Sequence, residues 1–296
     1  MSVEATSPAV ESAQANAFEF VRSLSVELSG GRVELPSFPD VAVRVRRALA
    51  DETSTVDQVV RIVGSEPALA ARLLKMSNSA MLNRSGRQVT DLRTAVNRMG
   101  HNMVRSAAIS FAMAQIRSAS KLKGLEKFLE DLWESSTNVA ALSFVLASRL
   151  TKLNPDEAML AGLLHGIGKL YIVTRAEKHP LLFMNPEAMH EMIRDWHAAI
   201  GKAIVENWEF SDAMAEAIAS QDDLSREAEE PRPPDLSDVI AAALLMASFA
   251  SDPGGLSAAM QGSPVIDRLR LTGEKAGEIM RESGNEIASL RSALKG

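Results

Sequence analysis

The sequence predicts an all-α protein, and three observations support that fold class. Alanine is the commonest of the 296 residues, and it is accompanied by many leucine, arginine and glutamate residues, which also favour helices. No alternating run of β-branched and aromatic residues is bounded by an Asn-Gly or Asp-Gly turn, so no strand pair is predicted. Several segments begin with residues that cap helices, such as the Thr55–Gln58 capping box and the Asn154-Pro155 pair.

The elements follow one another as helices separated by short polar or glycine-containing segments. Residues 1–14 are predicted to form a loose tail, and residues 222–234 an exposed polar loop between two core helices. Gly64, Gly100 and Gly124 stand where helices should stop. The predicted helices lie near residues 15–29, 40–50, 56–64, 67–77, 91–99, 102–118, 125–151, 156–178, 187–208, 212–221, 236–251 and 274–294.

Composition excludes several classes of protein. There is no cysteine, so a disulfide framework, a thiolate metal site and a thiol nucleophile are all excluded. The net charge of −6 argues against a globally basic nucleic-acid binder, and the aromatic content of 4% leaves few platforms for base stacking. The longest nearly apolar run, residues 239–250, is too short to span a bilayer. The acidic, polar N-terminus does not resemble a secretory signal, so a cytoplasmic location is expected.

Charge divides the chain into two unlike parts. Residues 32–123 carry 15 basic and 7 acidic residues, a net charge of +8, whereas residues 124–296 carry 16 basic and 27 acidic residues, a net charge of −11. The sign changes near Lys121–Gly124, which is predicted to be a linker. Two interpretations stay open: two solvated surfaces of unlike composition, or a basic part that binds an acidic partner. The candidate partner-binding patch consists of Arg44, Arg46 and Arg47.

Four segments, taken in order, give the chain a family resemblance. They are Leu35–Pro39, Glu66–Ala80, Asp91–Gly100 and Gly162–Leu170. Together they resemble the HD-related output domain (HDOD) family of bacterial signalling proteins, a degenerate branch of the HD phosphohydrolase superfamily. The resemblance covers about residues 32–225, and it implies an all-helical fold of two lobes. It predicts a tail and leading helix over residues 1–31, a first lobe over residues 32–120, and a degenerate HD-like second lobe with C-terminal helices over residues 121–296.

The resemblance also implies where a metal site would have been. HD enzymes hold divalent metals with histidine and aspartate side chains, and the metals activate a water molecule that attacks a phosphate. In this chain Ser135 occupies the position of one metal-binding histidine. Gly166 replaces the aspartate of the His-Asp pair, while the expected lysine is present as Lys169 and one later histidine as His197. Gln221 and Asp222 replace a His-His pair. We call these positions the vestigial site; they are Ser135, His165, Gly166, Lys169, His197, Gln221 and Asp222.

The vestigial site predicts no metal, no cofactor and no catalytic residue, because catalytic metal sites use at least three protein ligands. One alternative stays open. His165, His197 and Asp222 are residue types that form a two-histidine, one-carboxylate iron site. Such a mononuclear site would leave a residual metal-dependent phosphohydrolase, similar to a cyclic-dinucleotide phosphodiesterase. Against it, His165 lies in an apolar segment, where a histidine that is hydrogen-bonded to a carbonyl oxygen is the commoner arrangement.

Gly162, Gly166 and Gly168 do not form a phosphate loop, because no strand precedes them and no Lys-Ser/Thr pair follows. Their spacing predicts a close approach of another helix. The predicted function is that of a non-catalytic regulatory module. It would bind a partner protein, or a small ligand in the cleft where HD enzymes hold their metals. The resemblance implies a sensor kinase, a response regulator or a cyclic-dinucleotide enzyme as the partner, and neither a membrane nor a nucleic acid is expected.

Overall fold

The computed structural model describes residues 40–51, 54–79, 82–83, 86–119, 125–175, 186–227 and 232–295, together with positions 20, 22, 23 and 26. In these residues the protein is all-α, as predicted. The helices are α2 (Asp40–Ala50), α3 (Val56–Gly64), α4 (Pro67–Ser77), α5 (Leu92–Ala119), α6 (Glu126–Leu150), α7 (Pro155–Leu164), α8 (Ile167–Thr174), α10 (Pro186–Asn207), α11 (Asp212–Ala219), α12 (Leu236–Ser248), α13 (Pro253–Met260), α14 (Pro264–Leu269), α15 (Gly273–Glu282) and α16 (Gly284–Lys295).

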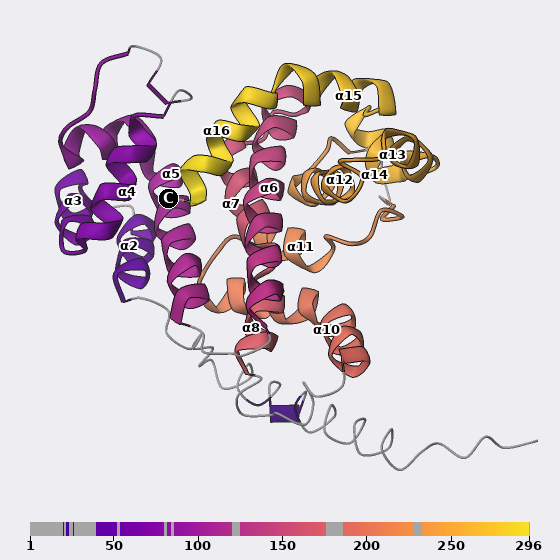
Figure 1. Ribbon diagram of the computed structural model, residues 1–296, viewed down its shortest axis with the longest axis horizontal. Coiled ribbons are helices and arrows are strands. Elements are labelled where there is room, and N and C mark those ends of the chain that lie inside the picture. Colours follow the sequence, from indigo (N-terminus) through magenta and orange to yellow (C-terminus); the bar gives the residue numbers. More distant parts are fainter. Residues whose placement is uncertain are drawn as a thin grey trace, which may run out of the picture.

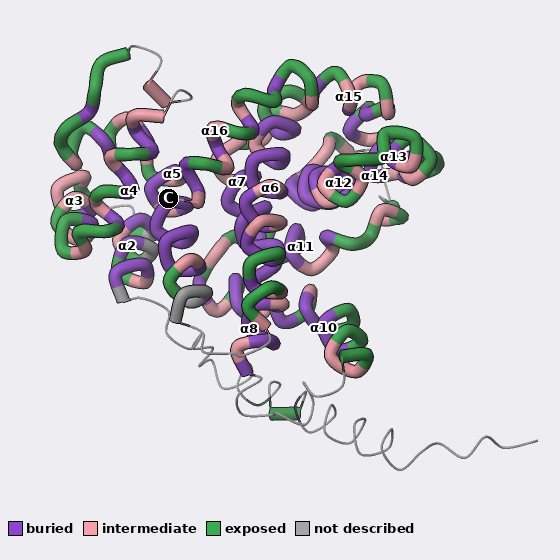
Figure 2. The backbone as a smooth tube through the Cα atoms, in the orientation of Figure 1, coloured by how far each residue is buried: buried purple, intermediate pink, exposed green. Residues whose placement is uncertain are grey.

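Two long helices, α5 and α6, run through the middle of the molecule (Figure 1). Helices α2, α3 and α4 pack against α5 on one side, while α7 and α12 pack against α6 on the other. Helix α10 contacts α8 and α11, and α11 contacts α12. The buried positions are concentrated on α5, α6, α7, α8 and α12, so one continuous apolar core joins the two sides (Figure 2).

Local sequence signals explain several helix ends. The predicted capping box at the start of α3 is present, with the Thr55 side chain accepting from the Gln58 backbone and the Gln58 side chain accepting from the Thr55 backbone. Asn154 caps α7 by accepting from the Asp156 backbone at 2.9 Å. Gly100 interrupts α5 with a φ of 71°, a value that favours glycine. The predicted break between residues 99 and 102 is therefore confirmed as a kink within one long element.

Two predicted helices are each split in the structure, and two further helices were not predicted. The helix predicted over residues 156–178 is two helices, α7 and α8, because the chain turns at His165 and Gly166. The helix predicted over residues 274–294 is interrupted at Ser283, so that α15 and α16 are separate. Helices α13 and α14 were not predicted, although each begins with a capping residue followed by proline.

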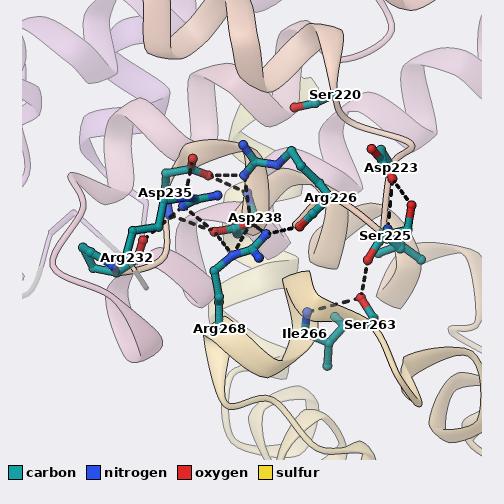
Figure 3. Close-up of polar contacts among 12 residues, drawn as sticks. Ser220, Asp223, Ser225, Arg226, Arg232, Asp235, Asp238, Ser263, Ile266 and Arg268 are labelled. Carbon is teal, nitrogen blue, oxygen red and sulfur yellow. Dashed lines mark hydrogen bonds and ion pairs between the residues drawn. The ribbon is translucent and has the colours of Figure 1, made fainter. Parts of the chain in front are cut away.

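A buried ion cluster attaches the segment after α11 to the C-terminal helices (Figure 3). Asp238 is fully buried at the start of α12. It accepts from Arg226 at 2.8 Å, from Arg232 at 3.1 Å and from Arg268 of α14 at 2.7 Å. Asp235 shares Arg226 and Arg232 at 2.7 and 3.0 Å. Residues 222–234 were predicted to form an exposed loop. Two arginines of this segment, Arg226 and Arg232, form ion pairs with Asp235 and Asp238.

The C-terminal helix α16 bridges the two sides of the molecule. It contacts α6 and also α5 and α4, and Figure 1 shows the chain ending beside α5. Leu290 and Leu294 are buried on its inner face. Arg291 and Lys295 both pair with the Glu134 carboxylate of α6. The helix therefore packs on its own chain through apolar and ionic contacts.

Some predictions fall on residues that the structure does not describe. These are most of the helix predicted over residues 15–29, the linker predicted at Lys121–Gly124, and the Arg46 side chain. The proposed boundary between the two lobes therefore stays a prediction. In the described part of the chain, no helix has both the length and the apolar character needed to cross a membrane.

Candidate functional site

Four structural elements carry the positions of the vestigial site. Ser135 lies on α6, His165 and Gly166 form the turn between α7 and α8, and His197 lies in the middle of α10. Gln221 follows the end of α11 and is buried, as are His165 and His197. These helices pack on one another: α6 on α7 and α8, and α10 on α8 and α11.

The glycines of this region allow helix backbones to approach closely, as predicted. A Cβ atom on Gly162 would lie 2.8 Å from the Cα of Ala140 on α6. A Cβ atom on Gly168 would lie 1.9 Å from the carbonyl oxygen of His197 on α10, so no larger residue fits there. The two contacts bring α6 and α10 against the α7–α8 turn.

His165 is a buried histidine whose tautomer is fixed by one hydrogen bond. Its Nδ1 lies 2.8 Å from the carbonyl oxygen of Gly162, and the side chain is buried. A carbonyl oxygen only accepts, so Nδ1 carries the proton and Nε2 is left as an acceptor. Burial lowers the pKa of His165 to about 4, so the ring is neutral at neutral pH.

His197 and Asp222 form the closest polar contact of the vestigial site. The Nε2 of His197 lies 3.0 Å from Oδ2 of Asp222. The His197 side chain is enclosed, whereas the Asp222 side chain is 62% exposed, so the pair runs from the interior to the surface. The hydrogen bond from His197 lowers the pKa of Asp222, and this effect outweighs the opposing effect of burial.

Lys169, one turn after His165, is half-buried on α8. Burial lowers the pKa of its amine, and the negative charge of Asp222 acts in the opposite direction. The vestigial site therefore combines one amine, one carboxylate and two imidazoles, of which that of His165 is neutral.

Three buried polar atoms of this region have no hydrogen-bond partner among the described residues. They are Oγ of Ser136, Nδ1 of His197 and Oε1 of Gln221. Buried serines elsewhere in the helices donate to a carbonyl oxygen of the preceding turn, as Ser143 does to Val139 at 2.7 Å. Ser136 does not, and it lies on the side of α6 that faces Gly166.

Ser136 is not among the predicted positions. The predicted serine is the preceding residue, Ser135, which is only half-buried. A Cβ atom on Gly166 would lie 3.3 Å from Oγ of Ser136, so Ser136 is the serine in contact with the turn. Neighbouring residues on a helix point about 100° apart, and only the packing shows which of them faces the site.

The residues present do not fit a divalent metal. No three histidine, aspartate or glutamate side chains of the described residues are grouped so that they could hold one. His197 and Asp222 are brought together, but they bind each other, and no third imidazole or carboxylate of the described residues completes a ligand group with them. The remaining polar groups are serine hydroxyls and a glutamine amide, which are poor ligands for such an ion.

The low pKa of His165 makes a prediction about acid stability. Because the unfolded histidine has a pKa near 6.5 and the folded one about 4, the unfolded chain binds more protons in this range. The stabilising contribution is fully present above pH 6.5 and is lost as the pH falls toward 4, by a total of about 3 kcal/mol. Urea unfolding at a series of pH values measures this loss, and the NMR titration of the His165 ring measures its pKa directly. A midpoint near 6.5 would contradict the prediction.

The candidate basic patch lies on α2, a helix that contributes no residue to the vestigial site. Arg44 and Arg47 are exposed. Arg44 donates through Nη2 to Oγ of Ser65 at 3.0 Å, which orients its guanidinium along the surface. The main neighbours of α2 are α3 and α5, and Arg44 and Arg47 lie on its exposed side.

Comparison with known proteins identifies the family. The chain is similar to a candidate metal-dependent phosphohydrolase from Shewanella amazonensis SB2B, whose crystal structure gives a TM-score of 0.73 at 25% identity and covers 95% of this chain and 99% of that one. A candidate signal transduction protein from Marinobacter aquaeolei VT8 gives a TM-score of 0.60 at 21% identity, over 95% of this chain and 66% of that one.

The chain is also similar to an uncharacterized protein of Treponema pallidum (strain Nichols). It is 24% identical over 215 residues, which are 68% of this chain but only 40% of the relative. The chain thus spans less than half the length of that protein. The model of the HDOD domain matches residues 35–224. The chain therefore belongs to the HDOD domain family.

Proposed function

We propose that the protein is a non-catalytic signal-transduction module that binds a regulatory partner. One observation carries the proposal: the vestigial site has serine, glycine and glutamine where the HD enzymes have metal ligands, and the described residues contain no group of three histidine, aspartate or glutamate side chains that could hold a metal. Without a bound divalent ion, no water molecule is activated for attack on a phosphate. The module then acts by binding rather than by turnover.

The named relatives support this reading in different ways. The Marinobacter aquaeolei protein is named for signal transduction, which agrees with a regulatory role. The Shewanella amazonensis protein is named as a metal-dependent phosphohydrolase, which favours the alternative of a residual enzyme. The donor atoms in this chain favour the regulatory role, because too few of them suit a metal.

Metal content and turnover decide between these two functions. Protein purified without a histidine tag should contain less than one metal ion per chain by elemental analysis. It should not hydrolyse model phosphodiesters or cyclic dinucleotides in the presence of Mn²⁺ or Fe²⁺. Steady turnover that is lost on His165→Ala would establish the phosphohydrolase and refute the proposal.

The first lobe supplies the partner-binding surface in this proposal. Residues 32–123 have a net charge of +8, and Arg44 and Arg47 are exposed on α2. A positive surface attracts an acidic protein surface and accelerates its association. The partner is a sensor kinase, a response regulator or a cyclic-dinucleotide enzyme with an acidic binding face.

Charge reversal tests the patch. The triple variant Arg44→Glu, Arg46→Glu and Arg47→Glu should lose capture of its partner by at least about tenfold, while its helical circular dichroism is unchanged. The matched control reverses three exposed basic residues of the second lobe, and it should capture the partner as the wild type does. Equal capture by both variants would refute the electrostatic part of the proposal. The control positions are Lys127, Arg194 and Arg281.

The vestigial site suggests a second candidate function, the binding of a small ligand. Ser136, His197 and Gln221 each have a buried polar atom without a partner, and such atoms cost free energy unless a ligand or water binds them. Native mass spectrometry of protein isolated from the source organism tests this function. A copurified small molecule that is lost from the Gln221→Leu variant would support it, and identical spectra of the free chain would refute it.

A further inference from the structure

Helix α4 carries an enclosed guanidinium that has no ion-pair partner among the described residues. Arg72 of α4 is only 7% exposed, and its helix face is shared by the buried residues Leu69, Leu73 and Met76. Neither Nε nor Nη2 of Arg72 has a hydrogen-bond partner among the residues that the structure describes. Charged groups in protein interiors are nearly always paired, because an unpaired one is costly to desolvate.

Other enclosed arginines of the chain have partners. Arg105 donates through Nη2 to the carbonyl oxygen of Leu49 at 2.9 Å. Arg175 donates through Nη2 to the hydroxyl of Tyr171 at 2.9 Å. Arg105 and Arg175 each leave only Nε without a partner, whereas Arg72 leaves both Nε and Nη2, and no described residue supplies a partner for this pair of nitrogens.

The two orphaned nitrogens lie on the edge of the guanidinium that binds oxyanions side-on. Nε and Nη2 point in the same direction and match two oxygens of a carboxylate or a phosphate. The same protein uses this edge elsewhere. Arg268 holds Asp238 with Nε at 3.1 Å from Oδ2 and Nη2 at 2.7 Å from Oδ1. In Arg72 the equivalent edge is present and unfilled.

The surroundings favour an anion. The first lobe has a net positive charge, so the nearby potential attracts negative groups. Burial lowers the pKa of Arg72 to about 10, which is the direction expected of a cation that lacks an adjacent anion. An ion pair in such an apolar setting is strong, because little water competes with it.

We propose that Arg72 anchors an oxyanion-binding site, which takes the carboxylate or phosphate group of a small molecule on Nε and Nη2. The site is distinct from the Arg44 patch and from the vestigial site. A test of anion binding at Arg72 is therefore independent of the proposed function. Helix α4 is packed against α3, α5 and α16, so entry of the anion requires a local opening of these helices.

Thermal unfolding of the full chain tests the site with acetate and inorganic phosphate as probes. The reference is potassium chloride at the same ionic strength and pH. The wild type should unfold at least about 2 °C higher in acetate, in phosphate or in both than in chloride. The variant Arg72→Met should lose this difference. Lys75→Met, which removes an exposed charge from the same helix, should keep it.

The variant Arg72→Lys shows whether anion binding needs the two nitrogens Nε and Nη2 or only a positive charge. Lysine keeps the positive charge but lacks the two-nitrogen edge, so most of the anion-specific shift should be lost. This variant also decides the matter if Arg72→Met does not fold. General stabilisation by a salt acts on every variant alike, so only the difference between variants is informative.

The probes distinguish the ligand classes. A shift in acetate alone identifies a carboxylate ligand, a shift in phosphate alone identifies a phosphoryl ligand, and shifts in both identify their shared oxyanion chemistry. No anion-specific shift in the wild type would overturn the proposal. An equal shift in the wild type and in the Arg72 variants would overturn it as well.

Discussion

Replacing Asp238 by alanine should lower the free energy of unfolding by about 3–5 kcal/mol. The carboxylate is fully buried, and it is the shared counter-charge of Arg226, Arg232 and Arg268. Asp235 would remain as a partner for the first two arginines, but no ion pair of the described chain other than Asp238 holds Arg268, whose side chain is 12% exposed. Urea unfolding followed by circular dichroism measures the loss.

The matched control for Asp238 is Asp223→Ala. Asp223 is an exposed carboxylate of the segment between α11 and α12, and it accepts from the Ser225 backbone and hydroxyl at 2.9 and 2.7 Å. Its loss should cost about 1 kcal/mol or less, because water replaces the exposed contacts. If the Asp238 variant were as stable as this control, the ion cluster would not hold the C-terminal helices in place.

The effect of Asp238 should also depend on pH. Burial by itself raises the pKa of this carboxyl, but hydrogen bonds from Arg268, Arg226 and the Asp235 backbone outweigh it and lower the pKa to about 2. Because the folded pKa lies below the ordinary value of 3.8, the contribution is fully present above pH 4 and is lost as the pH falls toward 2. The difference between wild type and Asp238→Ala should therefore shrink over this range.

Gly168→Ala should lower the free energy of unfolding by about 3 kcal/mol or more. The added Cβ would lie 1.9 Å from the carbonyl oxygen of His197 and 2.9 Å from the backbone nitrogen of Gly201. Both atoms belong to the backbone of α10, so no side-chain rotation relieves the overlap and the two helices must separate. Thermal and urea unfolding measure the loss.

Gly277→Ala is the control for the same substitution in an open position. A Cβ there would meet only the end of the Arg281 side chain at 3.5 Å, which is ordinary contact. Alanine favours a helix over glycine, so α15 should gain up to about 1 kcal/mol. A similar loss of unfolding free energy in both variants would contradict the prediction. It would mean that the backbone flexibility of glycine, rather than the close approach of α10, matters at Gly168.

Much of the fold follows from local sequence. The start of α3 is predicted because Thr55 and Gln58 satisfy backbone groups only three residues apart. The break at His165 and Gly166 was not predicted, because residues 155–174 are all compatible with one helix and the turn depends on packing against α6 and α10. The short helices α13 and α14 were missed for a different reason: each has a proline start but too few residues for a periodic pattern.

The candidate site was predictable in its residue types but not in its contacts. The three glycines at positions 162, 166 and 168 predicted a close helix approach, and the structure shows one at Gly162 and another at Gly168. The role of Ser136 in place of Ser135 depends on how α6 is rotated about its axis, which tertiary packing decides. The partners of Asp238 lie up to 30 residues away in the chain, so only the cap that it forms with Asp235 could be predicted.

The bridging position of α16 has a practical consequence for anyone who trims this protein. The family match ends at residue 224, but α16 begins at residue 284 and covers parts of α4, α5 and α6. A fragment cut at the family boundary would bare the apolar strip beneath Leu290 and Leu294 and leave Glu134 without its two cations. Such a fragment should self-associate. Proteins that it captured would bind non-specifically to the newly exposed apolar surface and would not identify the regulatory partner.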